Sequence, residues 1–182
     1  MKILRDEIVY DGKFIRTIRR HFLNTAGKPH VWEMVERKTY GRIVAIAAIT
    51  PKKEIILEKT FRIPLKSYVF EFPAGLMDKK GESEKIAIRR ELLEETGYVV
   101  DKVRLLYAGP FNTGMIDDRM AVYLGTNARK IAEPKPEPAE DITVVKVPLK
   151  NLLNFLSSQK RVLCDIKIPA VLPYLEKEGL LR

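Results

Sequence analysis

The sequence predicts an α/β fold in which helices cover a mixed β-sheet, preceded by a small antiparallel β unit. Apolar segments typical of strands recur along the whole chain, few segments have helical character, and the first 40 residues hold strand-like segments alone. A chain of 182 residues has room for one well-buried core and a small appendage. We therefore expect a β unit over residues 1–40 and one α/β domain over residues 41–182.

The N-terminal unit has three expected strands, at residues 2–10, 13–23 and 30–38. Asp11-Gly12 between the first two is a strong hairpin signal, and a turn with Gly27 and Pro29 separates the next two. Three strands alone bury little apolar surface. The unit must pack on the rest of the chain or on a second subunit, and we expect a homodimer.

The α/β domain opens on a strand after Gly41, because RIVAIAAIT is the continuous apolar run of a fully buried strand. Further strands are expected at residues 54–61, 68–72, 102–108, 120–125 and 142–147. The run AEPKPEPA at residues 132–139 is typical of a mobile surface loop. Residues 149–157 and 168–178 have helical character, and Pro173 indicates a kink or a shorter helix.

Composition excludes several classes of protein. No apolar run approaches the roughly 18 residues that cross a bilayer, and MKILRDEIVY lacks the apolar centre of a signal peptide. The lone cysteine, Cys164, fits a reducing compartment. The net charge of +9 favours anionic partners, but the basic residues are dispersed rather than gathered into a nucleic-acid-binding stretch. We expect a cytoplasmic protein whose partner is a small anionic molecule rather than a membrane or nucleic acid.

A helix is expected from Glu84 to Thr96, after a glycine-bearing loop that follows a buried strand. Ser83 can cap the start of this helix, and Gly97 can end it. Ligands commonly bind at strand-loop-helix corners of this kind.

Three carboxylates share one side of this helix, because Glu91 lies three residues before Glu94 and four before Glu95. Like charges at that spacing destabilise a helix by roughly 0.2–0.5 kcal/mol per pair. Hard cations such as Mg²⁺ or Mn²⁺ turn that repulsion into coordination, and Arg90 can reach Glu94. A solvated acidic helix face is the alternative, but the surrounding loop and strand favour a metal site.

The segment resembles the Nudix box, G-x5-E-x7-R-E-U-x-E-E-x-G-U, in which U is a bulky apolar residue. The residues that fit in register are Glu82, Arg90, Glu91, Leu92, Glu94, Glu95, Gly97 and Tyr98. Six residues rather than five separate Gly75 from Glu82, so the loop has one extra residue, at Lys79 or Lys80. The resemblance implies a Nudix α/β/α sandwich that uses divalent metal to split a diphosphate.

The similarity extends to the ADP-ribose and ADP-sugar pyrophosphatases. It is carried by Trp32-Glu33, Arg37, Phe61-Arg62 and the run Glu71-Phe72-Pro73-Ala74-Gly75-Leu76. In those enzymes an N-terminal β unit forms a dimer and a Nudix sandwich follows it. The resemblance implies ADP-ribose as the leading substrate, with AMP and ribose 5-phosphate as products.

The resemblance also implies a role for each matching residue. The Ala74 carbonyl, Glu91 and Glu95 would bind the metal, and Glu94 and Arg90 would complete the catalytic segment.

The substrate would be bound by four residues, Trp32, Arg37, Arg62 and Leu76. Trp32 matches an indole that stacks on adenine, although packing in a core or interface is an equal alternative. Guanidinium groups suit phosphate oxygens through their bidentate fork, whereas isolated arginines are more often surface pairs.

The family takes one more glutamate from a loop after the box. Glu140, directly after the proline-rich loop, matches best as a metal ligand and as the base that deprotonates the attacking water. Glu137 is the substitute, and an ordinary loop carboxylate is the alternative.

One position departs from the ADP-ribose branch, because Thr113 precedes Gly114 where those enzymes carry a proline. Pro110 could replace that proline from a shifted loop. Several functions therefore stay open beside ADP-ribose hydrolysis: another nucleoside diphosphate sugar, a dinucleotide such as NADH or an adenosine polyphosphate, a non-catalytic nucleotide sensor, and RNA processing.

Overall fold

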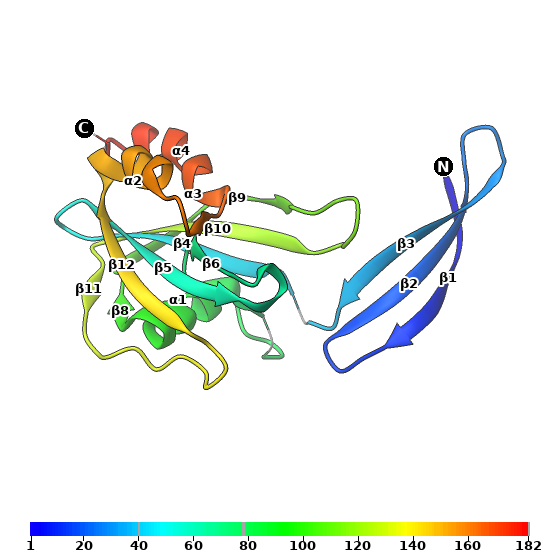
Figure 1. The fold of residues 1–182 in the computed structure, drawn as a ribbon, viewed down its shortest axis with the longest axis horizontal. Coiled ribbons are helices and arrows are strands. Elements are labelled where there is room, and N and C mark those ends of the chain that lie inside the picture. The colour runs from blue at the N-terminus through cyan, green and yellow to red at the C-terminus, as the bar shows by residue number, and fades with distance from the viewer. Residues whose placement is uncertain (40, 78, 182) are drawn as a thin grey trace.

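The computed structural model describes residues 1–39, 41–77 and 79–181 and has two parts. An N-terminal sheet stands apart from a larger body in which helices cover a mixed sheet (Figure 1). The predicted α/β class and the N-terminal antiparallel β unit are confirmed. The predicted boundary at residue 40 lies outside the described residues.

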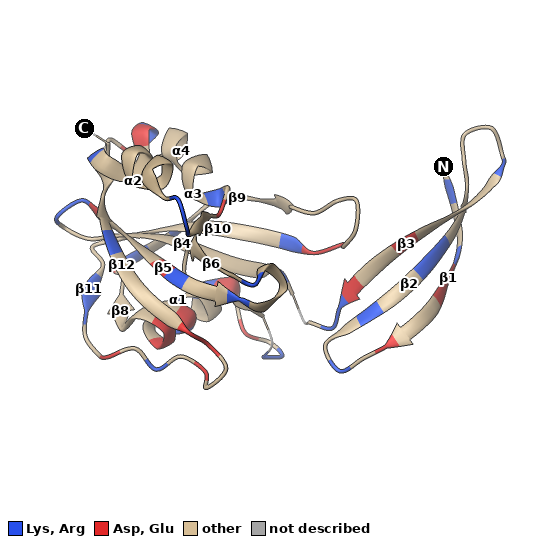
Figure 2. Cartoon of the chain, viewed as in Figure 1, with Lys and Arg blue, Asp and Glu red and all other residues tan. Residues whose placement is uncertain are grey.

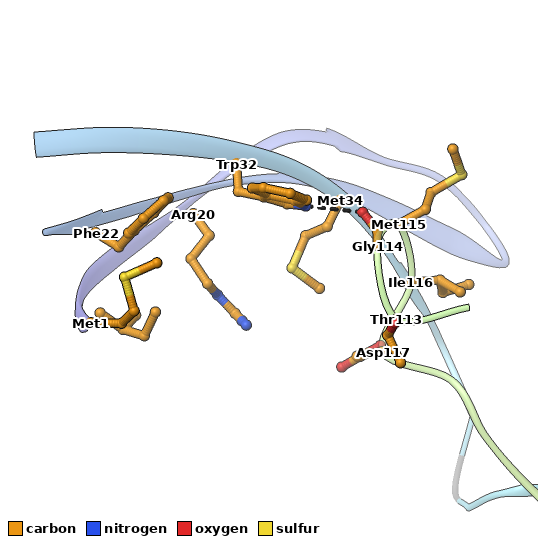
Figure 3. A pocket seen from close by; sticks show the side chains of 11 residues that line it. Met1, Arg20, Phe22, Trp32, Met34, Thr113, Gly114, Met115, Ile116 and Asp117 are labelled. Atoms are coloured by element: carbon orange, nitrogen blue, oxygen red, sulfur yellow. Dashed lines mark hydrogen bonds between the residues drawn. The ribbon is translucent and has the colours of Figure 1, made fainter. Parts of the chain in front are cut away.

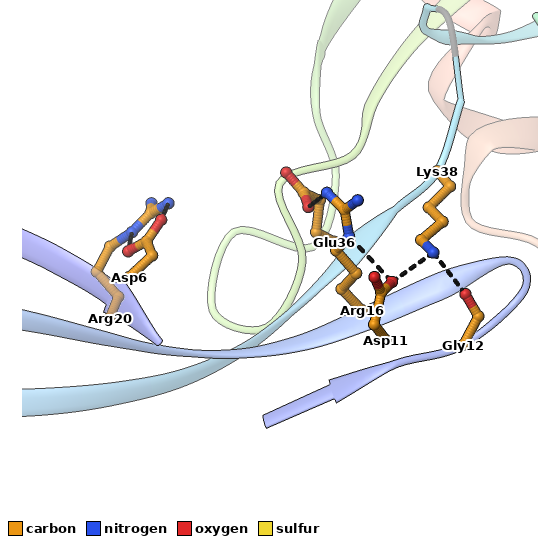
Figure 4. A network of polar contacts seen from close by, with 7 residues as sticks. All are labelled: Asp6, Asp11, Gly12, Arg16, Arg20, Glu36 and Lys38. Carbon is orange, nitrogen blue, oxygen red and sulfur yellow. Dashed lines mark hydrogen bonds and ion pairs between the residues drawn. The ribbon is translucent and has the colours of Figure 1, made fainter. Parts of the chain in front are cut away.

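The N-terminal sheet has the order β1-β2-β3, with both neighbouring pairs antiparallel. Its strands are β1 (Lys2–Asp11), β2 (Ile15–Leu23) and β3 (Pro29–Arg37). Ion pairs cross it in the middle and at one end (Figure 4): Arg20 makes a bidentate pair with Asp6, at 2.8 Å for each bond, and Arg16 and Lys38 both bind Asp11. Exposed pairs of this kind contribute roughly 0.2–1 kcal/mol each, so they fix the register more than they stabilise the sheet.

The N-terminal sheet joins the body through β3 and residues 113–117. The Val35 amide donates to the Met115 carbonyl at 2.8 Å, and the Trp32 indole N–H donates to the Gly114 carbonyl at 3.0 Å. Several large apolar side chains of this sheet remain exposed: Ile3, Leu4, Ile8, Val9, Tyr10, Phe14 and Val31. Packing on the body therefore covers only part of the sheet.

The body is built on an eight-stranded mixed sheet, in the order β13-β6-β5-β4-β10-β9, with β12 also on β5 and β7 also on β4. Its strands are β4 (Ile43–Ile49), β5 (Glu54–Arg62), β6 (Ser67–Glu71), β7 (Ala74–Leu76), β9 (Lys102–Pro110), β10 (Arg119–Thr126), β12 (Ile142–Pro148) and β13 (Leu163–Cys164). The pairs β10-β4 and β13-β6 are parallel, and the others are antiparallel. Two short strands, β8 (Tyr98–Val99) and β11 (Arg129–Lys130), pair separately.

Helices cover both faces of the main sheet, which makes an α/β/α sandwich. Helix α1 (Glu84–Thr96) packs Ala87, Ile88 and Leu92 on one face, against Val44 and Ile46 of β4. The C-terminal helices pack on the opposite face, against a second core whose members include Ala45, Ala47, Ile55, Leu57, Leu152, Ile168 and Leu175. Strand β4 supplies both cores with alternate residues, so a strand buried on both faces is apolar throughout.

The C-terminal segments are more divided than the sequence predicts. The segment predicted as one helix over residues 149–157 begins as a 3₁₀ turn (Leu149–Asn151) and continues as α2 (Leu152–Ser158). Residues 168–178 form two short helices, α3 (Lys167–Ala170) and α4 (Leu172–Lys177). Pro173 lies in the first turn of α4, where its missing N–H costs nothing, so the predicted shortening is confirmed. Another 3₁₀ turn (Ile63–Leu65) follows β5.

Lys and Arg are spread over both parts of the molecule and interleaved with Asp and Glu (Figure 2). None of the described helices has the length and apolarity to cross a lipid bilayer.

Candidate active site

Helix α1 forms where the capping signals predict it. The Ser83 hydroxyl accepts a hydrogen bond from the Ile86 amide at 3.4 Å, and Gly97 ends the helix with φ of 76°, donating its N–H to the Leu93 carbonyl. A Cβ on Gly97 would lie 2.0 Å from the Ala132 carbonyl oxygen. Glycine is therefore required there both for the left-handed backbone and for the close approach of the following loop.

Glu91 is seated on the backbone of Gly75, at the strand end that faces the helix. A Cβ built on Gly75 would lie 2.1 Å from both Cδ and Oε1 of Glu91. The Glu91 side chain is only 14% exposed, and Arg90 Nη1 lies 3.0 Å from its Oε1. Gly75 and Glu91 are thus in direct contact, and only glycine at position 75 leaves room for the Glu91 side chain.

Arg90 binds the carboxylates of two other box residues. Its Nε and Nη2 donate to the two oxygens of Glu82, each at 3.1 Å, and its Nη1 donates to Glu94 at 3.0 Å. The guanidinium holds the pKa of Glu82 below its usual range, and these carboxylates raise the pKa of Arg90. The predicted contact between Arg90 and Glu94 is present, and Arg90 also fixes the loop before the helix.

Glu95 is buried against the strand end in front of the helix, with 7% of its surface exposed. Its Oε2 accepts a hydrogen bond from the Ala74 amide at 3.1 Å. Burial raises the pKa of Glu95 to about 10, and the charges of Glu58, Glu91 and Glu140 add to that effect. A positive ion would relieve this concentration of negative charge.

Glu58 is a member of this site that the sequence analysis missed. It lies on β5, is 2% exposed, and shares a side-chain hydrogen bond with Glu95. Burial raises its pKa to about 8. The signal was present in the sequence, because Glu58 is a lone acid in the apolar run IILE, but it gave no indication of which residues this acid meets.

The residues at this site fit a hard divalent cation. They offer oxygen atoms alone, and one of these, Glu58 Oε1, is buried without a hydrogen-bond partner among the described residues. In the described part of the chain, no three Asp, Glu, His or Cys side chains form a ready-made set of ligands for one ion. Binding would therefore need backbone, water or substrate oxygens beside the carboxylates, and a small rotation of side chains.

Arg62 lies at the end of β5 and is oriented by Glu71. Its Nε and Nη2 donate to the two carboxylate oxygens of Glu71, at 2.9 and 2.5 Å. The charges of Glu95 and Glu58 also raise the pKa of Arg62, so this guanidinium lies beside the acidic site. The third nitrogen, Nη1, takes no part in the Glu71 pair.

The loop of residues 131–140 brings Glu140 to the acidic site. Glu140 is exposed, and its charge acts on both Glu95 and Glu58. Its Oε2 accepts a hydrogen bond from the Glu137 amide at 2.9 Å, so the two candidate bases share one turn. The loop is exposed as predicted, but the Lys135 amide donates to the Glu94 carbonyl at 2.6 Å and anchors its middle to the box helix.

Trp32 and Arg37 belong to β3 of the N-terminal sheet, and Figure 1 shows this sheet standing apart from the body that holds α1. Trp32 is half exposed beside a cavity of about 310 Å³, and its indole N–H points to Gly114 (Figure 3). Arg37 donates through Nε to the buried carboxylate of Asp118 at 3.0 Å, a partner that the sequence analysis did not single out. Leu76 ends β7, half-buried, one residue from Gly75.

A mixed sheet on which an acidic helix packs against a glycine of a short strand, here Gly75 of β7, is the architecture of a Nudix hydrolase domain. Residues 39–166 match the family model described as the NUDIX domain. The chain therefore belongs to the Nudix family. Together with the intact acidic helix, this makes it a Nudix pyrophosphohydrolase.

Relatives are similar over nearly the whole chain. An ADP-ribose pyrophosphatase of Bacillus subtilis is 33% identical over 182 residues, which cover 98% of this chain and 95% of that protein. An ADP-sugar pyrophosphatase of Mus musculus is 29% identical, covering 92% of this chain and 84% of its own. A crystal structure titled as an ADP compounds hydrolase superposes with a TM-score of 0.81 at 21% identity, covering 99% of this chain and 97% of the other, and so shows the same fold.

Proposed function

We propose that this protein hydrolyses the pyrophosphate of a nucleoside diphosphate derivative with Mg²⁺ or Mn²⁺, and that ADP-ribose is its leading substrate. The metal-dependent chemistry is supported by two contacts: Glu91 packs directly against the Gly75 backbone, and Glu95 accepts a hydrogen bond from the Ala74 amide. The substrate is supported by full-length similarity to an ADP-ribose pyrophosphatase. Hydrolysis would give AMP and ribose 5-phosphate.

Glu91, Glu95 and the Ala74 carbonyl would hold the metal, with Glu140 as a further ligand. When bound, a divalent cation neutralises pyrophosphate charge and stabilises an in-line displacement. Glu140 would accept a proton from the attacking water, whose oxygen bonds to one phosphorus as the bridging P–O bond breaks. Arg90 keeps Glu94 and the preceding loop in place, and so supports the metal ligands without touching the reacting atoms.

Glu140 is favoured over Glu137 as the base. Its charge acts on Glu58 and Glu95, whereas no such effect of Glu137 is found among the described residues. The Glu137 amide instead donates to the Glu140 carboxylate, which would orient it. The loop is bonded to the end of α1 at Ile131, Ala132 and Lys135, and the tip beyond Lys135 can close over bound substrate.

Substrate recognition would use both parts of the molecule. Arg62 would bind phosphate oxygens through Nη1, with Glu71 holding its fork in place, and Leu76 would contact substrate beside the box glycine. Trp32 would stack on adenine, and Arg37, five residues further along β3 and bonded to Asp118, would position the substrate. Because Thr113 and Gly114 line the cavity at Trp32, the residue that replaces the family proline lies where base recognition would occur.

A homodimer and a cytoplasmic location belong to the same proposal. The exposed apolar side chains of the N-terminal sheet support a second subunit, since large exposed apolar patches mark interaction sites. A second chain would also bring the base-binding residues of its N-terminal sheet, which stands apart from the body of its own chain. Light scattering coupled to size-exclusion chromatography should give a mass of twice 20.9 kDa.

A substrate panel tests the function and its rivals. We expect the highest kcat/KM with ADP-ribose, and lower values with other nucleoside diphosphate sugars, NADH and diadenosine polyphosphates. Preference for another compound would keep the chemistry and change the substrate. Binding without turnover in saturating Mg²⁺ would support a nucleotide sensor, and salt-sensitive RNA binding would support RNA processing.

A further inference from the structure

Strand β5 carries a carboxylate in the interior of the main sheet. Glu58 is paired in register with Glu71 on β6 and with Val144 on β12, so strands flank it on both sides. Ile56, two residues earlier, packs in the core under α1, and alternation places Glu58 on the same face. The Glu58 side chain therefore faces the box helix, with only 2% of its surface exposed.

A glutamate in this position is costly unless something binds it. Burying a carboxylate without full hydrogen bonding is unfavourable, and Oε1 of Glu58 has no hydrogen-bond partner within the described residues. Thr60, the next residue on that face, is 4% exposed, and its hydroxyl is also without a partner there. Two adjacent buried polar groups without partners indicate a place for an ion or its ligands.

Glu58 contacts the carboxyl group of a candidate metal ligand. Glu58 and Glu95 share a side-chain hydrogen bond, while Oε2 of Glu95 accepts the Ala74 amide. A cation inserted between the two carboxylates would replace their mutual contact with two oxygen ligands. It would also give a partner to the buried oxygen that has none.

We propose that Glu58 is an additional carboxylate ligand of the divalent cation, binding it through Oε1 beside Glu95. This inference rests on the proposed metal-dependent function, and it adds a ligand from β5 to those supplied by the box helix, Ala74 and Glu140. Together with Glu140 from the loop before β12, the site then has carboxylates from three structural elements, so the cation ties helix α1 to the sheet as well as neutralising the substrate.

Titration calorimetry with MnCl₂ on the full-length protein tests this inference without requiring turnover. We expect Glu58→Gln to weaken Mn²⁺ binding about 10-fold or more, and Glu58→Asp, which keeps a carboxylate, to weaken it less. Glu54→Gln is the matched control on the same strand and face, because Glu54 bonds to Thr50 instead. Its Mn²⁺ affinity should stay within about twofold of the parent protein.

A crystal soaked in MnCl₂ separates a ligand from a residue that acts indirectly. The inference expects the anomalous peak of Mn²⁺ within coordination distance of Glu58 Oε1. A peak bound by Glu95 but not by Glu58, or unchanged affinity in Glu58→Gln with binding abolished in Glu95→Gln, would overturn the inference and leave the proposed function standing. If the parent protein bound no Mn²⁺, both would fail. Glu58→Asp keeps the test open if Glu58→Gln does not fold.

Discussion

Replacing Gly75 with alanine should push the Glu91 carboxylate away from the backbone of residue 75 while leaving the fold intact. The new Cβ would lie 2.1 Å from Glu91 Cδ and Oε1, whereas real contacts of a Cβ stay above 3.0 Å. The carboxylate would therefore retreat by about 1 Å. Overpacking of this kind costs about 1–3 kcal/mol, which a domain of this size tolerates.

The effect on activity should be larger than the effect on stability. A displacement of about 1 Å at a catalytic group lowers the rate by roughly 100-fold, so kcat in Gly75→Ala should fall by about that factor. Mn²⁺ affinity should fall as well, since Glu91 is a candidate ligand. Shortening the carboxylate in Gly75→Ala/Glu91→Asp should restore part of the Mn²⁺ affinity, because the smaller side chain relieves the clash.

Steady-state kinetics and thermal melts distinguish the two effects. Gly109→Ala is the matched control, because its Cβ would meet nothing within 4 Å. Parent-like kcat and Mn²⁺ affinity in Gly75→Ala would refute the argument that Glu91 is seated on this glycine.

Three further predictions concern the charged groups. Arg90→Lys should lower kcat about 10-fold with KM within threefold, since an ammonium cannot form the fork to two carboxylates; an unchanged kcat would contradict this role. Glu140→Gln should lower kcat about 100-fold and Glu137→Gln less than threefold, and the reverse order would make Glu137 the base. The folded-state pKa values of Glu58 and Glu95, about 8 and about 10, lie above the unfolded-state value near 4.3, so the folded protein holds these protons more tightly. The resulting stabilisation is complete below about pH 4.3 and is lost as the pH rises through the two folded-state pKa values. In EDTA, Tm should therefore be lower at pH 9 than at pH 6 by about 3 °C or more, and Mg²⁺ should reduce the difference; a pH-independent Tm would contradict it.

Local chemistry made the acidic helix predictable. Ser83 and Gly97 mark the two ends of α1, and the structure places both as caps. The apolar run after Gly41 likewise predicts β4, because a strand buried on both faces has no polar positions. Each of these features is determined by residues that are neighbours in the sequence.

Contacts between distant segments were not predictable in the same way. Glu58 meets Glu95 only because β5 pairs with β4 and α1 packs on the same face of the sheet, and no sequence pattern gives that geometry. The proline-rich loop shows the same limit, since its bond from Lys135 to the Glu94 carbonyl needs the folded position of α1. Trp32 belongs to the N-terminal sheet, which stands apart from the body that holds α1, and its role in binding substrate stays a prediction.

Product analysis by chromatography after incubation with ADP-ribose and Mg²⁺, beside a Glu91→Gln control, tests the central claim most directly. The account predicts AMP and ribose 5-phosphate from the parent protein and neither product from the variant. Intact ADP-ribose after incubation with the parent protein, or equal product from both, would contradict it.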